Sequence, residues 1–202
     1  MPTTVAVRYA EAMTVFFTSD THFGHAGALG LLGRRFDSVK AMNAVMIARW
    51  QATVGPDDEV WHLGDFALTL APAARAEILD ALPGRKHLVA GNNDDADTLA
   101  LPGWASVQSY AELTVDDTPL VLCHYPFRTW NGISRGALNL HGHSHGRLEP
   151  MARQMDVGVD VFDFRPVTLA EIRAALRRRR RRRQAEGDAD AAGADGKRGA
   201  AR

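Results

Sequence analysis

The chain has 202 residues, 46% of them hydrophobic, and a formal net charge of zero. This length allows one well-buried domain, and the lack of any apolar run of about 18 residues excludes a membrane span. Cys123 is the single cysteine, which excludes an intramolecular disulfide framework. The first residues lack the basic and apolar layout of a secretory signal, so we expect a cytoplasmic protein.

Charge is unevenly distributed along the chain. From Arg177 onward, ten Lys and Arg stand against four Asp and Glu, a balance of +6, whereas residues 1–176 carry fourteen against twenty, a balance of −6. The tail at 177–202 has almost no apolar side chain larger than alanine, so we predict that its distal part is disordered. The run Arg177–Arg183 predicts weak, nonspecific binding of nucleic acid or other polyanions, with a merely solvated extension as the alternative.

The first half of the chain alternates short apolar runs with segments of helical periodicity. Buried strands are predicted at 14–20, 58–65 and 86–92. Between the first two strands, 38–50 has the apolar spacing of a helix with a capping residue just before it. A second helix is predicted at 71–82, where a proline suits the first turn.

The second half of the chain is dominated by strands. The segments 111–115 and 119–126 are joined by Asp-Asp-Thr-Pro, which predicts a hairpin. Two further strands are predicted at 137–143 and 155–162. Thr168 opens a T-x-x-E capping box, so a last helix should begin there and run into the arginines. Alternating strands and helices followed by strand pairs predict an α/β fold with parallel and antiparallel pairing mixed.

Each of five predicted strands is followed by side chains that can bind a metal. The strands close on S-D-T-H, L-G-D, G-N-N-D, C-H-Y-P and L-H-G-H-S-H. The seven candidate ligands in these motifs are Asp20, His22, Asp65, Asn92, His124, His143 and His145. Because open α/β sheets place their sites at the carboxyl ends of strands, we expect these side chains to converge. Asp20 and His22, like His143 and His145, are two residues apart, which would place each pair on one face of extended chain.

The chemistry of these donors predicts the metal. Carboxylate, amide and imidazole groups without a thiolate suit Mn²⁺, Fe or Zn²⁺ and not an all-oxygen calcium site. Seven ligands match two ions that share a bridging carboxylate, roughly 3.5–4 Å apart, as used for phosphate ester hydrolysis. Gly64, Gly91 and Gly142 stand beside ligands and should permit sharp turns. We therefore expect two divalent transition-metal ions, with Mn²⁺ preferred and Fe or Zn²⁺ as alternatives.

The ordered series D-x-H, G-D, G-N-x-D, H and G-H-x-H resembles the calcineurin-like metallophosphoesterase superfamily, in its small bacterial single-domain form. The resemblance spans about residues 13–167. It implies a four-layered α/β/β/α sandwich of mixed sheets with the site at the strand C-terminal ends. We accordingly expect an N-terminal extension at 1–12, a metallophosphoesterase domain at 13–176 and the tail at 177–202.

The same resemblance implies which residues hold each ion. One ion would be held by Asp20, His22, Asp65 and His145, and the second by Asp65, Asn92, His124 and His143. Asp65 would bridge the two ions. A hydroxide between them would attack phosphorus, which makes the expected protein a hydrolase acting on ester bonds.

The chain departs from the family pattern at Asn93, where a histidine that assists the leaving group is usual. An amide can hydrogen-bond a phosphate oxygen, but it cannot transfer a proton at neutral pH. His25 is the leading substitute, with a phosphate-contacting or structural role as its alternative. Arg128 and Arg135 are the predicted substrate contacts, because guanidinium groups suit phosphate, with surface solvation as the alternative.

The leading functional hypothesis is a two-metal phosphoesterase acting on small substrates, preferably phosphodiesters, since a diester with a good leaving group tolerates a weak general acid. A noncatalytic scaffold on the same fold is the first alternative, but it would be expected to lose ligands. A nucleic-acid-binding protein acting through the arginine run is the second. The acidic body would repel a polyanion except at the tail. The natural substrate and the oligomeric state are left open by the sequence.

Overall fold

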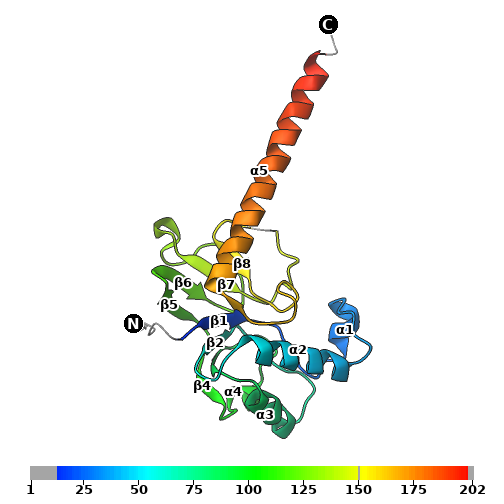
Figure 1. Cartoon of the computed structure of the whole chain (residues 1–202), viewed down its shortest axis with the longest axis vertical. Coiled ribbons are helices and arrows are strands. Elements are labelled where there is room, and N and C mark those ends of the chain that lie inside the picture. Colours follow the sequence, from blue (N-terminus) through cyan, green and yellow to red (C-terminus); the bar gives the residue numbers. More distant parts are fainter. Residues whose placement is uncertain (1–12, 150, 200–202) are drawn as a thin grey trace. The chain divides into compact units, whose positions relative to one another are not determined.

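The structure is a computed structural model that describes residues 13–149 and 151–199, so the expected extension at 1–12 lies outside the described residues. The chain divides into two compact units, Met1–Leu169 and Ala170–Arg202. The elements of the first unit, labelled in Figure 1, are β1 (Val15–Thr18), α1 (Gly27–Leu31), α2 (Val39–Thr53), β2 (Glu59–His62), α3 (Pro72–Ala81), β3 (Arg85–Val89), α4 (Ala96–Leu99), β4 (Trp104–Gln108), β5 (Ala111–Val115), β6 (Thr118–Leu122), the 3-10 helix η1 (Ile133–Arg135), β7 (Leu138–His141), β8 (Gln154–Asp156) and β9 (Val167–Thr168). Helix α5 (Leu169–Gly199) makes up most of the second unit.

Two mixed sheets form the body of the first unit. The five-stranded sheet has the order β4-β3-β2-β1-β9, in which β1 to β4 are parallel and β9 is antiparallel. The four-stranded sheet has the order β5-β6-β7-β8, with an antiparallel pair followed by two parallel pairs. Figure 1 shows α2, α3 and α4 on the side of the first sheet that is remote from β5 to β8. The predicted α/β sandwich of mixed sheets is confirmed.

The apolar spacing of α2 explains how the helical layer packs. Met42, Met46 and Trp50 are four residues apart, so they share one helix face, and all three are buried. They join one cluster with Phe16 of β1 and other apolar side chains of the first sheet. The helix starts where predicted, because the Ser38 side chain accepts a hydrogen bond from the Ala41 backbone N–H at 3.1 Å.

The hairpin of β5 and β6 also forms as predicted. Asp116 and Asp117 occupy the turn with positive φ angles of 46° and 56°. This left-handed conformation at both central residues matches the right-handed twist of the strands, and aspartate tolerates it better than most residues. The turn therefore sets the register in which Leu113 pairs with Leu120.

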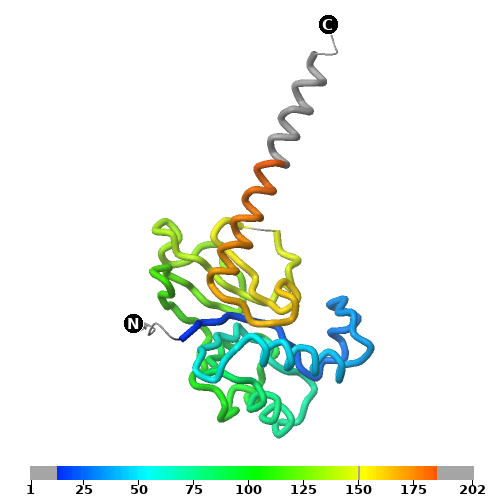
Figure 2. The backbone as a smooth tube through the Cα atoms, viewed as in Figure 1, coloured from blue at the N-terminus to red at the C-terminus, as the bar shows by residue number. Residues whose placement is uncertain are grey.

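The parallel register brings the carboxyl ends of β1, β2 and β3 to one edge of the first sheet. Thr18 pairs with His62, which pairs in turn with Leu88. The second sheet contributes to the same edge, because Ser19 forms a bridge with Gly158, just after β8. Figure 2 shows this late segment, in yellow, returning beside the blue start of the chain. Loops from both sheets therefore meet at one place.

Several short elements were not predicted from the sequence. They are α1, α4, η1, β4 and β9. Each has two to five residues, which is too short for a hydrophobic period to emerge. Strand β4 (WASVQ) is additionally partly exposed, since it lies at the edge of its sheet.

Helix α5 begins directly after Thr168, as the capping box predicts, and it carries the arginine run. Arginine and alanine both favour helix, which is consistent with its continuation to Gly199. The disorder expected of the distal tail stays a prediction. Within the part of the chain that the structure describes, no helix combines the length and the apolar character needed to cross a membrane.

Candidate metal centre

The seven predicted ligands all lie in loops that follow the carboxyl ends of strands. These loops come after β1 (Asp20 and His22), β2 (Asp65), β3 (Asn92), β6 (His124) and β7 (His143 and His145). Backbone hydrogen bonds tie the loops together: Asp20 N–H donates to the Gly64 carbonyl at 2.9 Å, and Gly142 N–H donates to the His124 carbonyl at 3.0 Å. The predicted convergence at the strand ends is what the structure contains.

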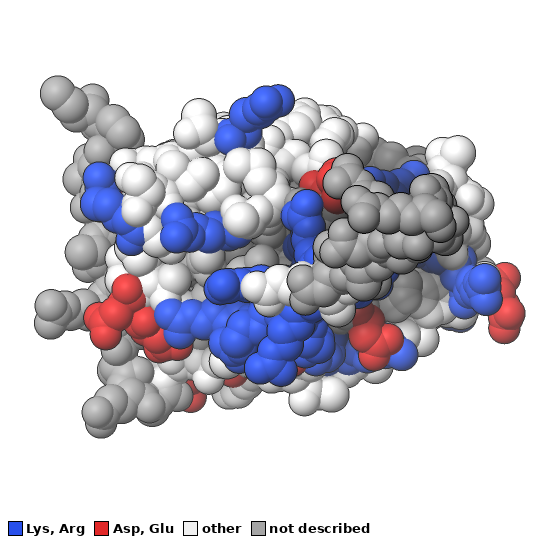
Figure 3. All heavy atoms as spheres, turned by 90° about the horizontal axis from the view of Figure 1, so that it is seen from above, with Lys and Arg blue, Asp and Glu red and all other residues white. Residues whose placement is uncertain are grey.

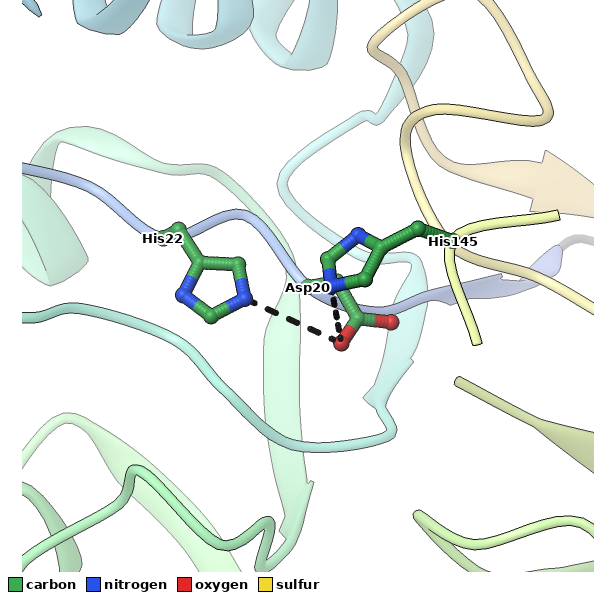
Figure 4. Close-up of side chains that lie close together, drawn as sticks. All are labelled: Asp20, His22 and His145. Atoms are coloured by element: carbon green, nitrogen blue, oxygen red, sulfur yellow. Dashed lines mark ion pairs between the residues drawn. The ribbon is translucent and has the colours of Figure 1, made fainter. Parts of the chain in front are cut away.

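One group of donors consists of Asp20, His22 and His145, whose ligand atoms all lie within 4.8 Å of one another. Figure 4 shows both imidazoles turned toward the Asp20 carboxylate. Asp20 Oδ1 lies 4.0 Å from His22 Nε2 and 3.9 Å from His145 Nε2. The two rings stack with centroids 5.3 Å apart. These separations are too long for hydrogen bonds and suit donors arranged around a shared cation.

A second group shares the Asp20 carboxylate and adds Asp65 and His124, again with ligand atoms within 4.8 Å. Asp65 of this second group also faces the first group. Its Oδ2 is 3.6 Å from His22 Nε2, and its Oδ1 is 3.6 Å from His124 Nε2. Each carboxylate oxygen therefore faces an imidazole of a different group.

The contact between His124 and Asn92 has the character of a ligand pair. His124 Nδ1 lies 2.8 Å from the Leu63 carbonyl oxygen, which can only accept, so this nitrogen carries the proton. In the neutral ring Nε2 is then an acceptor, yet it lies 3.0 Å from another acceptor, Asn92 Oδ1. This contact places an imidazole nitrogen and an amide oxygen side by side, where both could donate to one cation.

His143 contacts both groups, one through its backbone and the other through its ring. Its backbone N–H donates to the Asp20 carboxylate at 3.0 Å, whereas its ring lies against His124, with centroids 5.1 Å apart. His145 joins the first group instead. The expectation that each pair lies on extended chain is wrong for both pairs, and only Asp20 and His22 still fall into one group.

The backbone explains that error, because five of the seven predicted ligands have positive φ angles. They are Asp20 (57°), His22 (49°), Asp65 (58°), His143 (65°) and His145 (48°). Non-glycine residues rarely adopt this left-handed conformation, which costs of order 1–3 kcal/mol at each position. Such strain collects where function requires a side chain to point in one direction.

The three glycines beside the ligands serve two different purposes. Gly64 has a φ of +90°, and a Cβ there would lie 2.5 Å from the Gly91 backbone nitrogen. Gly91 and Gly142 do not have left-handed backbones, which corrects the expectation that they permit sharp turns. Their missing side chains instead allow close approach, since a Cβ would overlap the Asp65 carboxylate at Gly91 and Ser19 Oγ at Gly142.

The electrostatics of the centre fit a divalent cation. Both ring nitrogens of His22 are buried and have no hydrogen-bond partner among the described residues. Burial lowers the pKa of His22 to about 3, so its ring is neutral and free to donate a lone pair. Burial also raises the pKa of Asp20 to about 8. A bound cation would favour the ionised carboxylate and satisfy the orphaned imidazole together.

Asp160 orients a predicted ligand, and sequence reasoning missed it. It accepts a hydrogen bond from His145 Nδ1 at 2.7 Å, which directs Nε2 of the same ring toward Asp20. Burial alone would lower the pKa of His145, but this hydrogen bond and the Asp20 charge outweigh it and raise the pKa. The sequence signal is an acidic residue within the run 155–162, which is predicted as a strand; in the structure β8 ends at Asp156, so Asp160 lies in the loop that follows.

Arg34 holds Asp160 in turn. Its Nε and a terminal nitrogen each donate to one Asp160 oxygen at 2.8 Å, and its side chain is fully buried. The same guanidinium donates to the backbone carbonyls of Asp20 and Thr21. Arg34 therefore links the loop after β1 to the loop after β8 through hydrogen bonds to both. The pKa of Asp160 falls to about 2, because hydrogen bonds from His145 and Arg34 outweigh its burial.

Asn93, which replaces the usual motif histidine, is directed at Asp65. Its backbone N–H donates to Oδ1 at 2.8 Å and its side-chain amide donates to Oδ2 at 2.6 Å. Asp94 fixes the same loop by accepting from the backbone N–H groups of Asp65, Phe66 and Gly91 at 2.8–2.9 Å. Asn93 thus positions the central carboxylate in the structure.

Of the remaining predicted site residues, His25 lies beside the centre, whereas Arg128 and Arg135 have no hydrogen bond to it among the described residues. His25 lies beside the first group, with its ring centroid 5.3 Å from that of His22. Burial, and then the charge of Arg34, lower the pKa of His25. Arg128 and Arg135 are exposed on the segment between β6 and β7. Arg135 donates to Asn131 at 3.4 Å, and no hydrogen bond joins either arginine to a predicted ligand in the described part of the chain.

A mixed α/β sandwich with clustered histidine, aspartate and asparagine donors at its strand ends defines a metal-dependent hydrolase. The sequence profile of the calcineurin-like phosphoesterase superfamily domain matches residues 13–160. The chain belongs to this superfamily. It is therefore a metal-dependent phosphoesterase, a hydrolase acting on phosphate esters.

Similar proteins have been found in an archaeon, a phage and a bacterium. The chain is 28% identical over 163 residues to the uncharacterized protein MJ1445 of Methanocaldococcus jannaschii, covering 77% of this chain and 86% of that protein. It is 32% identical over 184 residues to the gene 66 protein of Mycobacterium phage D29, covering 73% and 88%. The crystal structure of AQ665 from Aquifex aeolicus, a protein of unknown function, superposes with a TM-score of 0.67 at 26% identity, covering 81% of this chain and 99% of that one.

Proposed function

We propose that the protein hydrolyses phosphodiesters at a centre of two divalent cations that share Asp65. The observation that carries this proposal is the placement of Asp65, whose two oxygens each lie 3.6 Å from an imidazole of a different donor group. The first ion would be held by Asp20, His22, Asp65 and His145, and the second by Asp65, Asn92, His124 and His143. Mn²⁺ suits this mixture of oxygen and nitrogen donors, with Fe and Zn²⁺ as alternatives.

When bound, two such ions polarise the phosphoryl oxygens and activate the attacking water. The protein supplies the geometry. Asp160 keeps the lone pair of His145 Nε2 directed at the centre, and the Leu63 carbonyl does the same for His124. Asn93 neutralises part of the charge on Asp65 and holds its plane. These contacts preorganise the donors, so little reorganisation is needed when substrate binds.

His25 is the proposed proton donor to the leaving group. It lies against His22, at the edge of the first donor group. Its pKa, which burial lowers, would rise beside an anionic phosphate. Because Asn93 cannot transfer a proton and is occupied with Asp65, we favour diesters with stable leaving groups over monoesters.

The test compares two substrates and counts metal ions. Protein stripped with a chelator and reloaded with Mn²⁺ should bind two equivalents and hydrolyse bis-p-nitrophenyl phosphate faster than p-nitrophenyl phosphate. One equivalent at full activity would contradict the shared centre, and a preference for the monoester would contradict the substrate class. A noncatalytic scaffold predicts no turnover of either ester with any metal.

The arginine run of α5 supports a weak affinity for nucleic acid. Arg177, Arg178 and Arg180–Arg183 are exposed. Seven charges over seven helical residues span roughly 10 Å, a linear density close to the one phosphate per about 1.7 Å of duplex DNA. Figure 3 shows a group of Lys and Arg side chains near the middle of the view. We propose that this run retains polyanions nonspecifically.

A further inference from the structure

The candidate centre is accessible from one side. Asp20, His22 and Asp65 are buried, with 0%, 3% and 2% of their surfaces exposed. In contrast, Asn92 and His143, which both lie against His124, are exposed. A phosphate ester can therefore reach the centre over these two residues.

Tyr125 stands at this open side. Its ring centroid lies 4.7 Å from that of His143 and 5.1 Å from that of His124, with interplanar angles of 63° and 73°. The tyrosine directly follows His124 in sequence, and Pro126 after it restricts the backbone. Edge-to-face contacts with two imidazoles hold one part of the ring, and the residue remains 46% exposed.

Tyr125 differs from the other exposed large residues of the described chain in what it contacts. The other exposed large hydrophobic residues are Leu31, Val107, Tyr110, Leu148 and Val161. Tyr110, the other aromatic residue among them, lies against Phe127, with centroids 6.1 Å apart. Tyr125 instead contacts two predicted ligands. It therefore offers an exposed aromatic ring beside the proposed reaction centre, and such rings can bind bases by stacking.

We propose that Tyr125 is the stacking platform for a nucleobase carried by the substrate, which makes the substrates nucleoside phosphodiesters. This inference rests on the proposed function. The proposed proton donor, His25, lies against His22 of the first donor group, whereas Tyr125 lies against His124 and His143 of the second. The leaving group belongs on the His25 side, so the base on Tyr125 belongs to the ester group that stays on phosphorus. Every base offers a π-face, so this subsite selects for a base without selecting which one.

The test uses two diesters with the same p-nitrophenolate leaving group: thymidine 5′-(p-nitrophenyl phosphate) and methyl p-nitrophenyl phosphate. Wild-type protein loaded with Mn²⁺ should favour the thymidine ester in kcat/KM. Tyr125→Leu should lower this preference by roughly 5- to 100-fold, the range expected from the loss of one base-stacking contact. Tyr125→Phe keeps the ring and should keep the preference. Tyr110→Leu removes an exposed tyrosine that contacts no predicted ligand, so it serves as the matched control.

An unchanged preference in Tyr125→Leu would overturn the inference, and so would an equal loss in Tyr125→Phe, which would assign the effect to the hydroxyl. Failure of wild-type protein to hydrolyse either ester would reject the proposed function instead. In that case, calorimetric titration of the Mn²⁺-loaded protein with thymidine 5′-phosphate and methyl phosphate still tests the subsite. The nucleotide should bind more tightly, and Tyr125→Leu should abolish the difference; equal affinities in wild-type protein would overturn the subsite.

Discussion

His145 donates its Nδ1 hydrogen to Asp160 across 2.7 Å and thereby presents Nε2 to Asp20, 3.9 Å away. A histidine ring has two nitrogens, and without a fixed partner either could carry the proton. Asp160 removes this freedom, and Arg34 fixes Asp160 with two hydrogen bonds of 2.8 Å. The orientation of one predicted ligand therefore depends on a residue outside the predicted ligand set.

Asp160→Asn should weaken metal binding without unfolding the protein. An amide accepts a weaker hydrogen bond than a carboxylate and leaves Arg34 without its charged partner, so metal affinity should fall about 10- to 100-fold. Isothermal titration with Mn²⁺ measures the loss, and circular dichroism checks the fold. Asp163→Asn is the matched control, because Asp163 is 77% exposed and pairs with Arg49 on the surface. Equal affinities in the two variants would remove Asp160 from the metal centre.

Asp65→Asn tests the shared carboxylate. An amide offers one oxygen in place of two and no charge, so both ions should bind more weakly and the rate should fall by roughly 10³-fold or more. Metal stoichiometry and hydrolysis of bis-p-nitrophenyl phosphate are measured together. Near-normal activity at saturating Mn²⁺ would show that Asp65 does not join two ions.

Much of the fold could be predicted because its main elements have strong local signals. The four-residue spacing of Met42, Met46 and Trp50 specified a helix face, and the Asp116–Asp117 turn specified a hairpin. Strand β4 and the two-residue β9 carry no such period, since their place is decided by pairing with distant strands. These elements could not be predicted from local sequence.

The candidate ligands could be predicted because strand ends and donor side chains can both be recognised in short stretches of sequence. The residues that orient the ligands could not be predicted in this way. Arg34 and Asp160 are 126 positions apart, and neither belongs to a ligand motif. The positive φ angles at Asp20 and His145 likewise arise from loops held at both ends, so a rule for extended chain misplaced the side chains. Asn93 could be identified as a departure, but its bond to Asp65 required the structure.

His25→Ala tests the proton donor. If His25 protonates the leaving group, its loss should slow esters of poorly leaving alcohols by about 10²–10⁴-fold and p-nitrophenyl esters far less, because p-nitrophenolate leaves without help. Rates on a series of aryl and alkyl diesters give the dependence on leaving-group pKa. A uniform loss across the series would make His25 a residue that binds phosphate.

Gly142→Ala tests the close packing beneath the centre. A Cβ at this position would overlap Ser19 Oγ and the Asp20 carboxylate, so the loops after β1 and β7 must separate. We expect a destabilisation of about 1–3 kcal/mol, the usual cost of overpacking, together with lower metal affinity. Urea unfolding and Mn²⁺ titration measure the two effects. Gly30→Ala is the control, since a Cβ there meets no atom within 4 Å and alanine favours helix α1.

Ending the chain after Arg178 separates the body from the arginine run. All predicted ligands lie between Asp20 and His145, and the apolar positions of α5, namely Leu169, Ile172 and Leu176, are retained. The residues at 180–185 that would be removed are exposed, so their loss should leave fold, metal content and hydrolysis of small diesters unchanged. Circular dichroism, metal analysis and kinetics on bis-p-nitrophenyl phosphate test each of these expectations.

The same truncation should remove the affinity for nucleic acid. Only two arginines of the seven-residue run remain, so the slope of log affinity against log salt should fall from about −6 to about −2 on duplex DNA. Fluorescence anisotropy with labelled DNA at several salt concentrations measures this slope. An unchanged slope would place the polyanion contact on the body, for example at the exposed Arg128 and Arg135. A truncated protein that is folded and metal-loaded yet inactive on small diesters would instead place the arginine run within the catalytic machinery.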